Sequence, residues 1–193
     1  MRKFGITFVA VLATLGIAAI APAQRMLGAM PRHFLLFNPK VQAELNLTAA
    51  QKKAVEAAGG DAISTDDQGR IRIQMSQGTD MDGIKAGLKK AITAVQDKRL
   101  TELWIQRDGS FALSDADVAK SLGLSDDQKK KVSAIFEEFG EGMQDLIMSS
   151  GGKVGPEESK SLRDKTKKKL DAILNAGQKA KFESMKGKLF KWT

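Results

Sequence analysis

The sequence has no cysteine, no tyrosine and only one histidine among its 193 residues. Without cysteine the chain can form no disulfide, no thiolate nucleophile and no cysteine-based zinc or iron–sulfur site. A single histidine excludes a multi-histidine metal site within one chain. Because these absences leave little catalytic chemistry, we expect a protein that is not an enzyme and that uses no metal and no cofactor.

The overall composition is that of a folded protein, with 42% hydrophobic and 28% charged residues. At roughly 150 residues per domain, the length allows one domain or two small ones. Lysine and arginine together number 31 against 23 acidic residues, which gives a formal net charge of +8. The chain is therefore basic, and we expect partners that carry negative charge.

The N-terminus has the pattern of a secretory signal. Two basic residues precede an uncharged run over residues 4–21, and small residues follow up to Ala23. We predict a signal peptide at 1–23, cleaved between Ala23 and Gln24, and a periplasmic or secreted mature protein with no further membrane span. An uncleaved anchor is the alternative, because about 18 apolar residues is the lower limit for crossing a membrane.

The remaining chain contains an internal repeat. Residues 41–55 align without gaps on residues 118–132, and residues 88–100 align on residues 170–182. The two offsets are 77 and 82 positions, as expected for two copies of one structural unit. The predicted organisation is a signal peptide (1–23), an N-terminal arm (24–40), a first helical repeat (41–110), and a second helical repeat with basic C-terminal helices (111–193).

Four sites in these repeats have the form of a helix capping box. In this motif the side chain of the N-cap residue accepts a hydrogen bond from the backbone three residues later, and the glutamine at that position bonds back to the N-cap backbone. Each site is preceded by an apolar residue and marks a helix start. The pairs are Thr48 and Gln51, Thr93 and Gln96, Ser125 and Gln128, and Asn175 and Gln178.

The spacing of apolar residues predicts a mainly α fold made of helical hairpins, with Met143 and Met148 as core residues of the longest helix. A polar–apolar alternation near residues 68–75 indicates a short strand or hairpin arm. The expected helices are 49–58, 81–92, 94–106, 126–148, 156–174, and a last helix carrying Phe182, Met185 and Leu189.

The capping motifs resemble those of a known family. Residues 47–51 fit the LTxxQ pattern of the Spy/CpxP-like periplasmic proteins, and residues 92–96 and 124–128 are variants of it. The resemblance implies a helical hairpin assembly, monomeric or dimeric, that acts as an ATP-independent chaperone for unfolded or apolar protein clients, or as an envelope-stress protein. This chain is longer, is internally duplicated and has a strand-like insert, and no residue matches the metal-sensing motif of some relatives.

The N-terminal arm contains His33 beside an apolar cluster that includes Phe34 and Phe37. A lone histidine there is expected to be a surface or packing residue. The two phenylalanines either dock the arm onto the helices or form an exposed contact for a partner. Pairs of aspartates, among them Asp115 and Asp117, lack the spacing of a calcium loop and are expected to cap helices.

The C-terminal end is strongly basic, because residues 160–193 contain 11 lysines and arginines against three acidic residues. Such a segment is either a solvated helix face or a surface for an anionic envelope partner, and nucleic acid is the least expected partner of an exported protein. An adaptor that binds one such partner is therefore the alternative to the chaperone. The candidate contact residues are Lys165, Lys167, Lys168, Lys169, Lys179, Lys181, Lys186 and Lys188.

Overall fold

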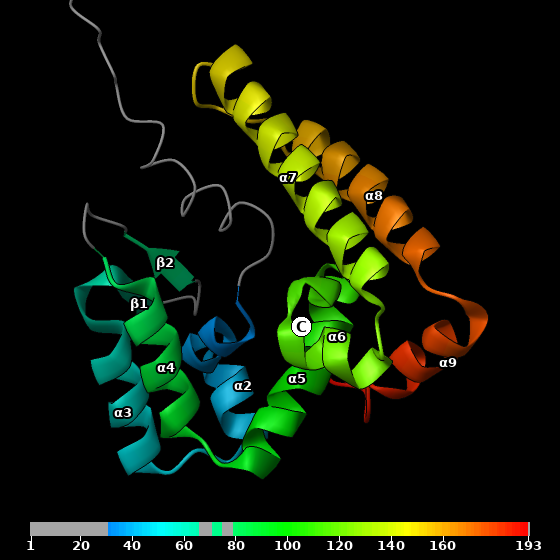
Figure 1. The fold of residues 1–193 in the computed structure, drawn as a ribbon. Coiled ribbons are helices and arrows are strands. Elements are labelled where there is room, and N and C mark those ends of the chain that lie inside the picture. The colour runs from blue at the N-terminus through cyan, green and yellow to red at the C-terminus, as the bar shows by residue number, and fades with distance from the viewer. Residues whose placement is uncertain (1–30, 66–70, 75–78, 193) are drawn as a thin grey trace, which may run out of the picture.

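The computed structural model describes residues 31–65, 71–74 and 79–192. It is mainly helical, as predicted (Figure 1). The predicted signal peptide and its cleavage site between Ala23 and Gln24 lie outside the described residues.

The first repeat consists of short helices around one hairpin. A 3-10 helix and a short α-helix open it, and two helices of similar length, α3 and α4, then pack against each other (Figure 1). A longer helix, α5, leads to the second repeat. The elements are η2 (Arg32–Phe37), α2 (Pro39–Glu44), α3 (Ala49–Gly59), η3 (Gly60–Ala62), β1 (Ile63–Thr65), β2 (Ile71–Ile73), α4 (Met81–Ala91) and α5 (Ala94–Asp108).

The second repeat has the same order of helices. Its opening 3-10 helix begins 77 positions after η2 and also has six residues, and its last helix begins 82 positions after α5. The duplication that the aligned residues indicate therefore extends to the secondary structure, and it begins at Arg32. The elements are η4 (Gly109–Ser114), α6 (Ala116–Leu122), α7 (Asp126–Ser149), α8 (Pro156–Ile173) and α9 (Ala176–Ser184).

The short strands lie in the connection between α3 and α4. Strand β1 pairs antiparallel with β2, and Ile63 lies opposite Ile73. The alternating pattern near residues 68–75 thus correctly indicated a hairpin arm, of which 71–74 are described. The rest of that segment lies outside the described residues.

The last helix ends earlier than the spacing of apolar residues predicted. Helix α9 ends at Ser184, and Gly187 has a φ of +59°, a backbone conformation that favours glycine and breaks the helix. Leu189, which was expected on this helix, lies beyond it and is 82% exposed. Phe182 lies on this helix, as predicted, and is buried.

A single hydrophobic core joins the two repeats. Trp104 and its neighbours on α5 lie within it, between the helices of the first repeat and η4. Phe111 of η4 packs edge-on against Phe139 of α7, with ring centroids 5.3 Å apart. The repeats are therefore joined through α5 and η4 into one packed body.

The N-terminal arm contributes directly to this core. Phe34 is fully buried and Phe37 is 5% exposed, so neither side chain is an exposed partner contact. Of the two alternatives for these phenylalanines, docking of the N-terminal arm onto the helices is the one that the structure shows, because η2 packs against α4 and α5. Consecutive side chains of a 3-10 helix point in different directions, and all six residues of η2 are buried because α2, α3, α4 and α5 pack around it.

Candidate functional site

All four predicted capping boxes are present. In the first repeat the hydroxyls of Thr48 and Thr93 accept hydrogen bonds from the backbone N–H of Gln51 and Gln96 at 3.2 and 3.3 Å. The Oε1 atoms of the two glutamines accept hydrogen bonds in return from the backbone of the threonines, at 3.1 and 2.9 Å. Each box satisfies donors that the first turn of a helix leaves free.

The structure adds a feature that the sequence did not predict: the glutamines of each repeat meet as a pair. Gln51 Nε2 donates to Gln96 Oε1 at 2.7 Å, and Gln96 Nε2 donates to Gln51 Oε1 at 3.2 Å. Gln96 Nε2 also reaches the carbonyl of Leu45 at 3.0 Å. We call this reciprocal contact the glutamine clasp; it ties the starts of α3 and α5 together.

The second repeat contains the same clasp. Ser125 caps α7 and Asn175 caps α9. Gln128 Nε2 donates to Gln178 Oε1 at 2.7 Å, and the reciprocal bond is 3.0 Å. A glutamine suits both tasks because its oxygen accepts from the backbone while its amide nitrogen donates across the clasp, which a glutamate could not do. The eight predicted capping residues therefore form four capping boxes, and their four glutamines form two clasps.

A buried ion-pair cluster lies where the N-terminal arm meets both repeats. The Arg32 side chain is 3% exposed and contacts three carboxylates, at 3.1 Å from Asp97, 2.5 Å from Asp115 and 2.7 Å from Asp117. Asp97 also accepts a hydrogen bond from His33 Nε2 at 2.9 Å. Asp115 caps α6, as predicted. The Arg32 guanidinium lies between the three carboxylates, where a bound metal cation would otherwise have to lie.

The cluster shifts the acid–base behaviour of its members. Burial alone would raise the pKa of Asp97, but hydrogen bonds from His33 and Arg32 and the charge of Arg32 lower it to about 2. The hydrogen bond from Arg32 also lowers the pKa of Asp117, more than burial raises it. Burial would lower the pKa of Arg32, but its carboxylate partners raise it above the ordinary value. The arginine thus stays charged and holds ionised carboxylates around it.

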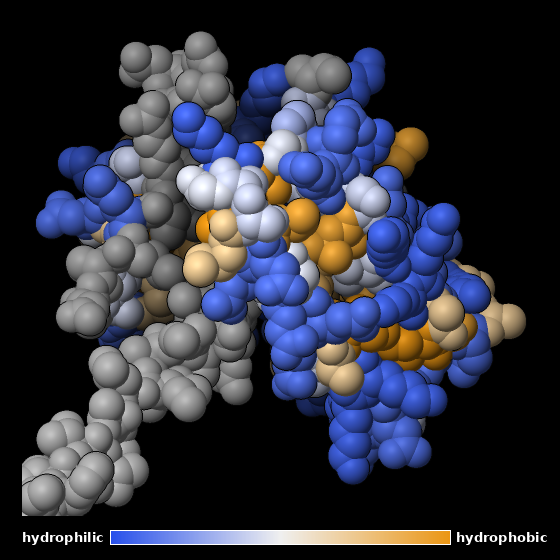
Figure 2. Space-filling model, turned by 90° about the horizontal axis from the view of Figure 1, so that it is seen from above, coloured by the Kyte–Doolittle hydropathy of each residue, from blue (hydrophilic) through white to orange (hydrophobic). Residues whose placement is uncertain are grey.

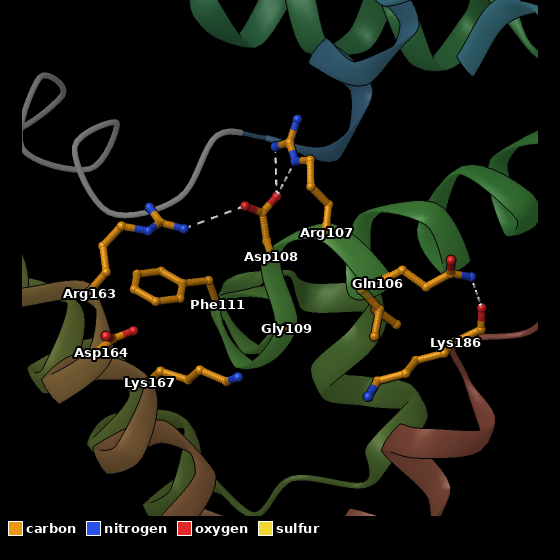
Figure 3. Close-up of a pocket in the computed structure, with 10 residues that line it drawn as sticks. Gln106, Arg107, Asp108, Gly109, Phe111, Arg163, Asp164, Lys167 and Lys186 are labelled. Carbon is orange, nitrogen blue, oxygen red and sulfur yellow. Dashed lines mark hydrogen bonds and ion pairs between the residues drawn. The ribbon is translucent and has the colours of Figure 1, made fainter. Parts of the chain in front are cut away.

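A pocket lies at the junction of the two repeats (Figure 3). We call it the junction pocket. It has a volume of about 230 Å³ and lies between the end of α5, the start of η4, the middle of α8 and the chain after α9. Its lining residues are Ile105, Gln106, Arg107, Asp108, Gly109, Phe111, Arg163, Asp164, Lys167 and Lys186.

Charged side chains dominate this pocket. Arg107 Nη2 lies 2.6 Å from Asp108 Oδ2, and Arg163 reaches the other oxygen of Asp108 at 3.6 Å. The Arg163 guanidinium also stacks over the Phe111 ring, 4.5 Å from its centroid. Figure 3 shows Lys167 and Lys186 extending toward the interior of the pocket from opposite walls.

The structure does not gather the eight predicted lysines into one patch. Lys167 and Lys186 line the junction pocket. Lys169 forms an ion pair with Glu138 across α7 and α8. The side chains of Lys165, Lys168, Lys179, Lys181 and Lys188 are exposed to solvent along α8, along α9 and after it. Sequence reasoning missed Arg107 and Arg163, because only the fold brings residues 56 positions apart to one cavity.

Helices α7 and α8 form the most prominent feature of the surface. They lie side by side and stand out from the rest of the protein (Figure 1). From residue 141 to residue 165, which we call the arm tip, no residue is buried. Met148 is 76% exposed, so the prediction that it belongs to the core is wrong: the two helices have no third layer there to cover it.

The arm tip keeps several apolar side chains despite this exposure. Figure 2, which looks down on the molecule from the side toward which the arm points, shows apolar surface between strongly hydrophilic side chains. The apolar residues of the arm tip that are only partly buried are Met143, Leu146, Ile147, Val154 and Leu162.

Neither a membrane span nor a metal site is found in the part of the chain that the structure describes. No helix there is both long and apolar enough to cross a membrane. No group of three or more histidine or acidic side chains there is arranged to hold a metal ion. Comparison of the chain with family models, curated proteins and solved structures finds no match.

Proposed function

We propose that the protein is an exported, non-enzymatic chaperone of the Spy/CpxP-like kind. It holds unfolded or apolar protein segments on the arm formed by α7 and α8, without ATP. The lysines of α8 attract acidic parts of the same segments. Its site of action is the periplasm or the exterior of the cell, as the predicted signal peptide implies.

The observation that carries this proposal is the exposed apolar surface of the arm tip. Helix α7 has 24 residues and is therefore roughly 36 Å long. In this length only Val132, Phe139 and Gly140 are buried, and all three precede the arm tip. Two helices can cover each other on one side only, so the remaining apolar side chains stay in contact with water. Apolar side chains that a fold leaves uncovered, such as Met148, are available for contact with another protein.

The charge around this surface supports the same function. Helix α8 presents exposed lysines beside the apolar residues, including Lys160, Lys165 and Lys168. Apolar contact supplies affinity that does not depend on one sequence, while the positive field speeds the encounter with acidic segments. The exposed Met148 can adapt to many partner shapes because its side chain is unbranched and flexible.

The test is the aggregation of a heated or chemically reduced client, followed by light scattering without ATP. We expect the protein to suppress aggregation, and suppression to weaken as salt concentration rises, since salt screens the lysines. Met148→Asp should reduce suppression. Val95→Asp is the matched control, because Val95 is 80% exposed but lies on α5 in the first repeat, and it should leave suppression unchanged.

Two results would overturn the proposal. One is a lack of suppression at any ratio of protein to client. The other is recovery of one stoichiometric envelope partner without general client protection, which would identify an adaptor.

A further inference from the structure

We infer that the junction pocket is a binding site for a small oxyanion, namely the phosphate or carboxylate group of a ligand. The pocket lies at the base of the arm, and neither Met148 nor the other apolar residues of the arm tip line it. The inference therefore goes beyond the proposed chaperone function and does not depend on it.

The first argument is the excess of positive charge. Four cationic side chains line the pocket, Arg107, Arg163, Lys167 and Lys186, against the two carboxylates of Asp108 and Asp164. Arg107 and Asp108 form a close pair, which removes one charge of each sign. The two lysines and Arg163 then face Asp164 alone within the pocket, which favours entry of a further anion.

The second argument is the number of unused hydrogen-bond donors. A guanidinium carries five N–H donors. In Arg163 only Nη2 forms an ion pair within the described residues, with Asp108 Oδ1 at 3.6 Å. Lys186 pairs with Glu183 one turn earlier on the chain at 2.6 Å, but the Glu183 side chain is 66% exposed and the pair is weakly held. Lys167 has no ion-pair partner in the described part of the chain. Its ammonium group lines the cavity and remains able to donate to a bound anion.

The third argument is that the pocket walls are fixed. Gln106 Nε2 donates to the backbone carbonyls of Lys186 and Lys188, and its Oε1 accepts from the backbone N–H of Phe190 at 2.9 Å. These bonds hold the chain after α9 in place as one wall. Opposite it, Phe111 orients Arg163 by stacking. The Arg163 guanidinium, held by this contact, loses little freedom when an anion binds.

The volume of the pocket limits the size of the ligand, and the backbone conformation of Gly109 leaves space for it. About 230 Å³ is less than the roughly 300–1,000 Å³ of sites that enclose drug-sized molecules, so the pocket suits one charged group and not a large cofactor. Gly109 has a φ of +57°, and a Cβ there would lie 3.7 Å from Lys167 Cε. Glycine at this position thus permits the turn and leaves space beside the lysine.

The experiment is a titration of the isotope-labelled protein, followed by backbone amide chemical shifts, with ionic strength held constant by sodium chloride. One titration uses inorganic phosphate and the other uses succinate. We expect saturable shifts at Gly109 and Phe111 with at least one of them. Lys167→Gln should raise the Kd about tenfold, since a hydrogen bond to a charged group is lost.

The control is Lys168→Gln, which removes the same charge from the next residue of α8, outside the pocket lining. It should change the Kd less than twofold. Both lysines are exposed, so both variants should unfold at the temperature of the original protein. Preference for phosphate identifies a phosphate-bearing ligand, and preference for succinate a carboxylate. Shifts that do not saturate with either anion, or equal effects of the two variants, would overturn the inference.

Discussion

The two repeats share a frame but differ in the hairpin that the frame holds. Both open with a six-residue 3-10 helix and close a glutamine clasp between two capped helices. In the first repeat the hairpin helices have 11 residues each, whereas in the second they have 24 and 18. The caps and clasps therefore define where the helices start, while hairpin length is free to vary. The longer hairpin is the one that exposes apolar surface.

The repeats also differ in how they handle charge at their openings. At the first position of η2 the chain places Arg32, whose side chain is sealed among carboxylates. At the first position of η4, 77 residues later, it places Gly109, beside which a pocket lies open. The first position of the first repeat thus carries a charge that ties the two repeats together, whereas the first position of the second repeat borders a pocket whose charges remain available.

The largest expected effect comes from removing the sealed arginine. Arg32→Ala leaves Asp97, Asp115 and Asp117 without their shared cation, close to one another and partly shielded from water. We expect the free energy of unfolding to fall by about 3 kcal/mol, because three neighbouring carboxylates, two of them largely shielded from water, lose their shared cation. Urea unfolding followed by circular dichroism measures this change.

The control for that change is Arg163→Ala in the second repeat. The Arg163 side chain is 45% exposed, and its ion pair with Asp108 is 3.6 Å long. We expect a loss of about 1 kcal/mol or less. Equal losses in the two variants would contradict the distinction between a sealed cluster and an open one.

The next largest effect is a loss of stability in acid. The pKa of Asp97 is lowered to about 2 in the folded protein, so this group favours folding above its ordinary pKa of 3.8. That contribution, about 2 kcal/mol, is lost as the pH falls from about 5 toward 2. Unfolding free energies measured across this range should show the loss, and Asp97→Asn should flatten the curve. If the unfolding free energy of the variant depended on pH as steeply as that of the original protein, Asp97 would not be the source of the loss in acid.

The helix starts could be predicted from the sequence because capping is local. Thr48 and Gln51 lie three positions apart, and their reciprocal bonds depend on little beyond the first turn. The offsets of 77 and 82 correctly indicated that the unit is duplicated. The short helices η2, α2, η4 and α6 were not predicted, since segments of six or seven residues show no helical period.

The candidate sites depend on contacts that a sequence does not show. Arg32 meets its carboxylates across 65 to 85 positions, and no local pattern connects them. Likewise, nothing near Phe34 distinguishes an apolar run that packs inward from one that meets a partner. Met148 continues the apolar spacing of α7, yet the chain provides no third helix to cover it. Spacing along a helix predicts which residues share a face, and the fold determines what that face meets.

A smaller effect is expected at the glutamine clasp. Gln178→Glu keeps an oxygen for the backbone of Asn175 but loses the donor that reaches Gln128 Oε1 at 3.0 Å and the carbonyl of Gly123 at 3.4 Å. Oxygens would then face each other in a buried site. We expect a loss of about 1–2 kcal/mol in thermal or urea unfolding.

The chain contains its own control for this substitution. Glu158 on α8 accepts from the backbone N–H of Gly155 at 2.9 Å, in the same position of the capping motif, and it is not part of a clasp. Glu158→Gln should change stability by about 0.5 kcal/mol, the contribution of an exposed charge at a helix N-terminus. Comparable losses at the two positions would show that exchange between glutamine and glutamate at this capping position has the same cost everywhere and that the clasp adds nothing to stability.

The smallest expected effect has opposite signs in the two hairpins. A Cβ at Gly142 on α7 would lie 3.1 Å from Leu162 Cδ1, the end of a flexible, partly exposed side chain that can move. Gly142→Ala should therefore stabilise the protein by about 0.5 kcal/mol, because alanine restricts the unfolded chain. A Cβ at Gly87 on α4 would lie 3.0 Å from Ala58 Cβ, which can move only with helix α3. Gly87→Ala should lower the melting temperature, whereas Gly142→Ala should raise it; a shift of the same sign in both would mean that the short hairpin adapts as readily as the long one.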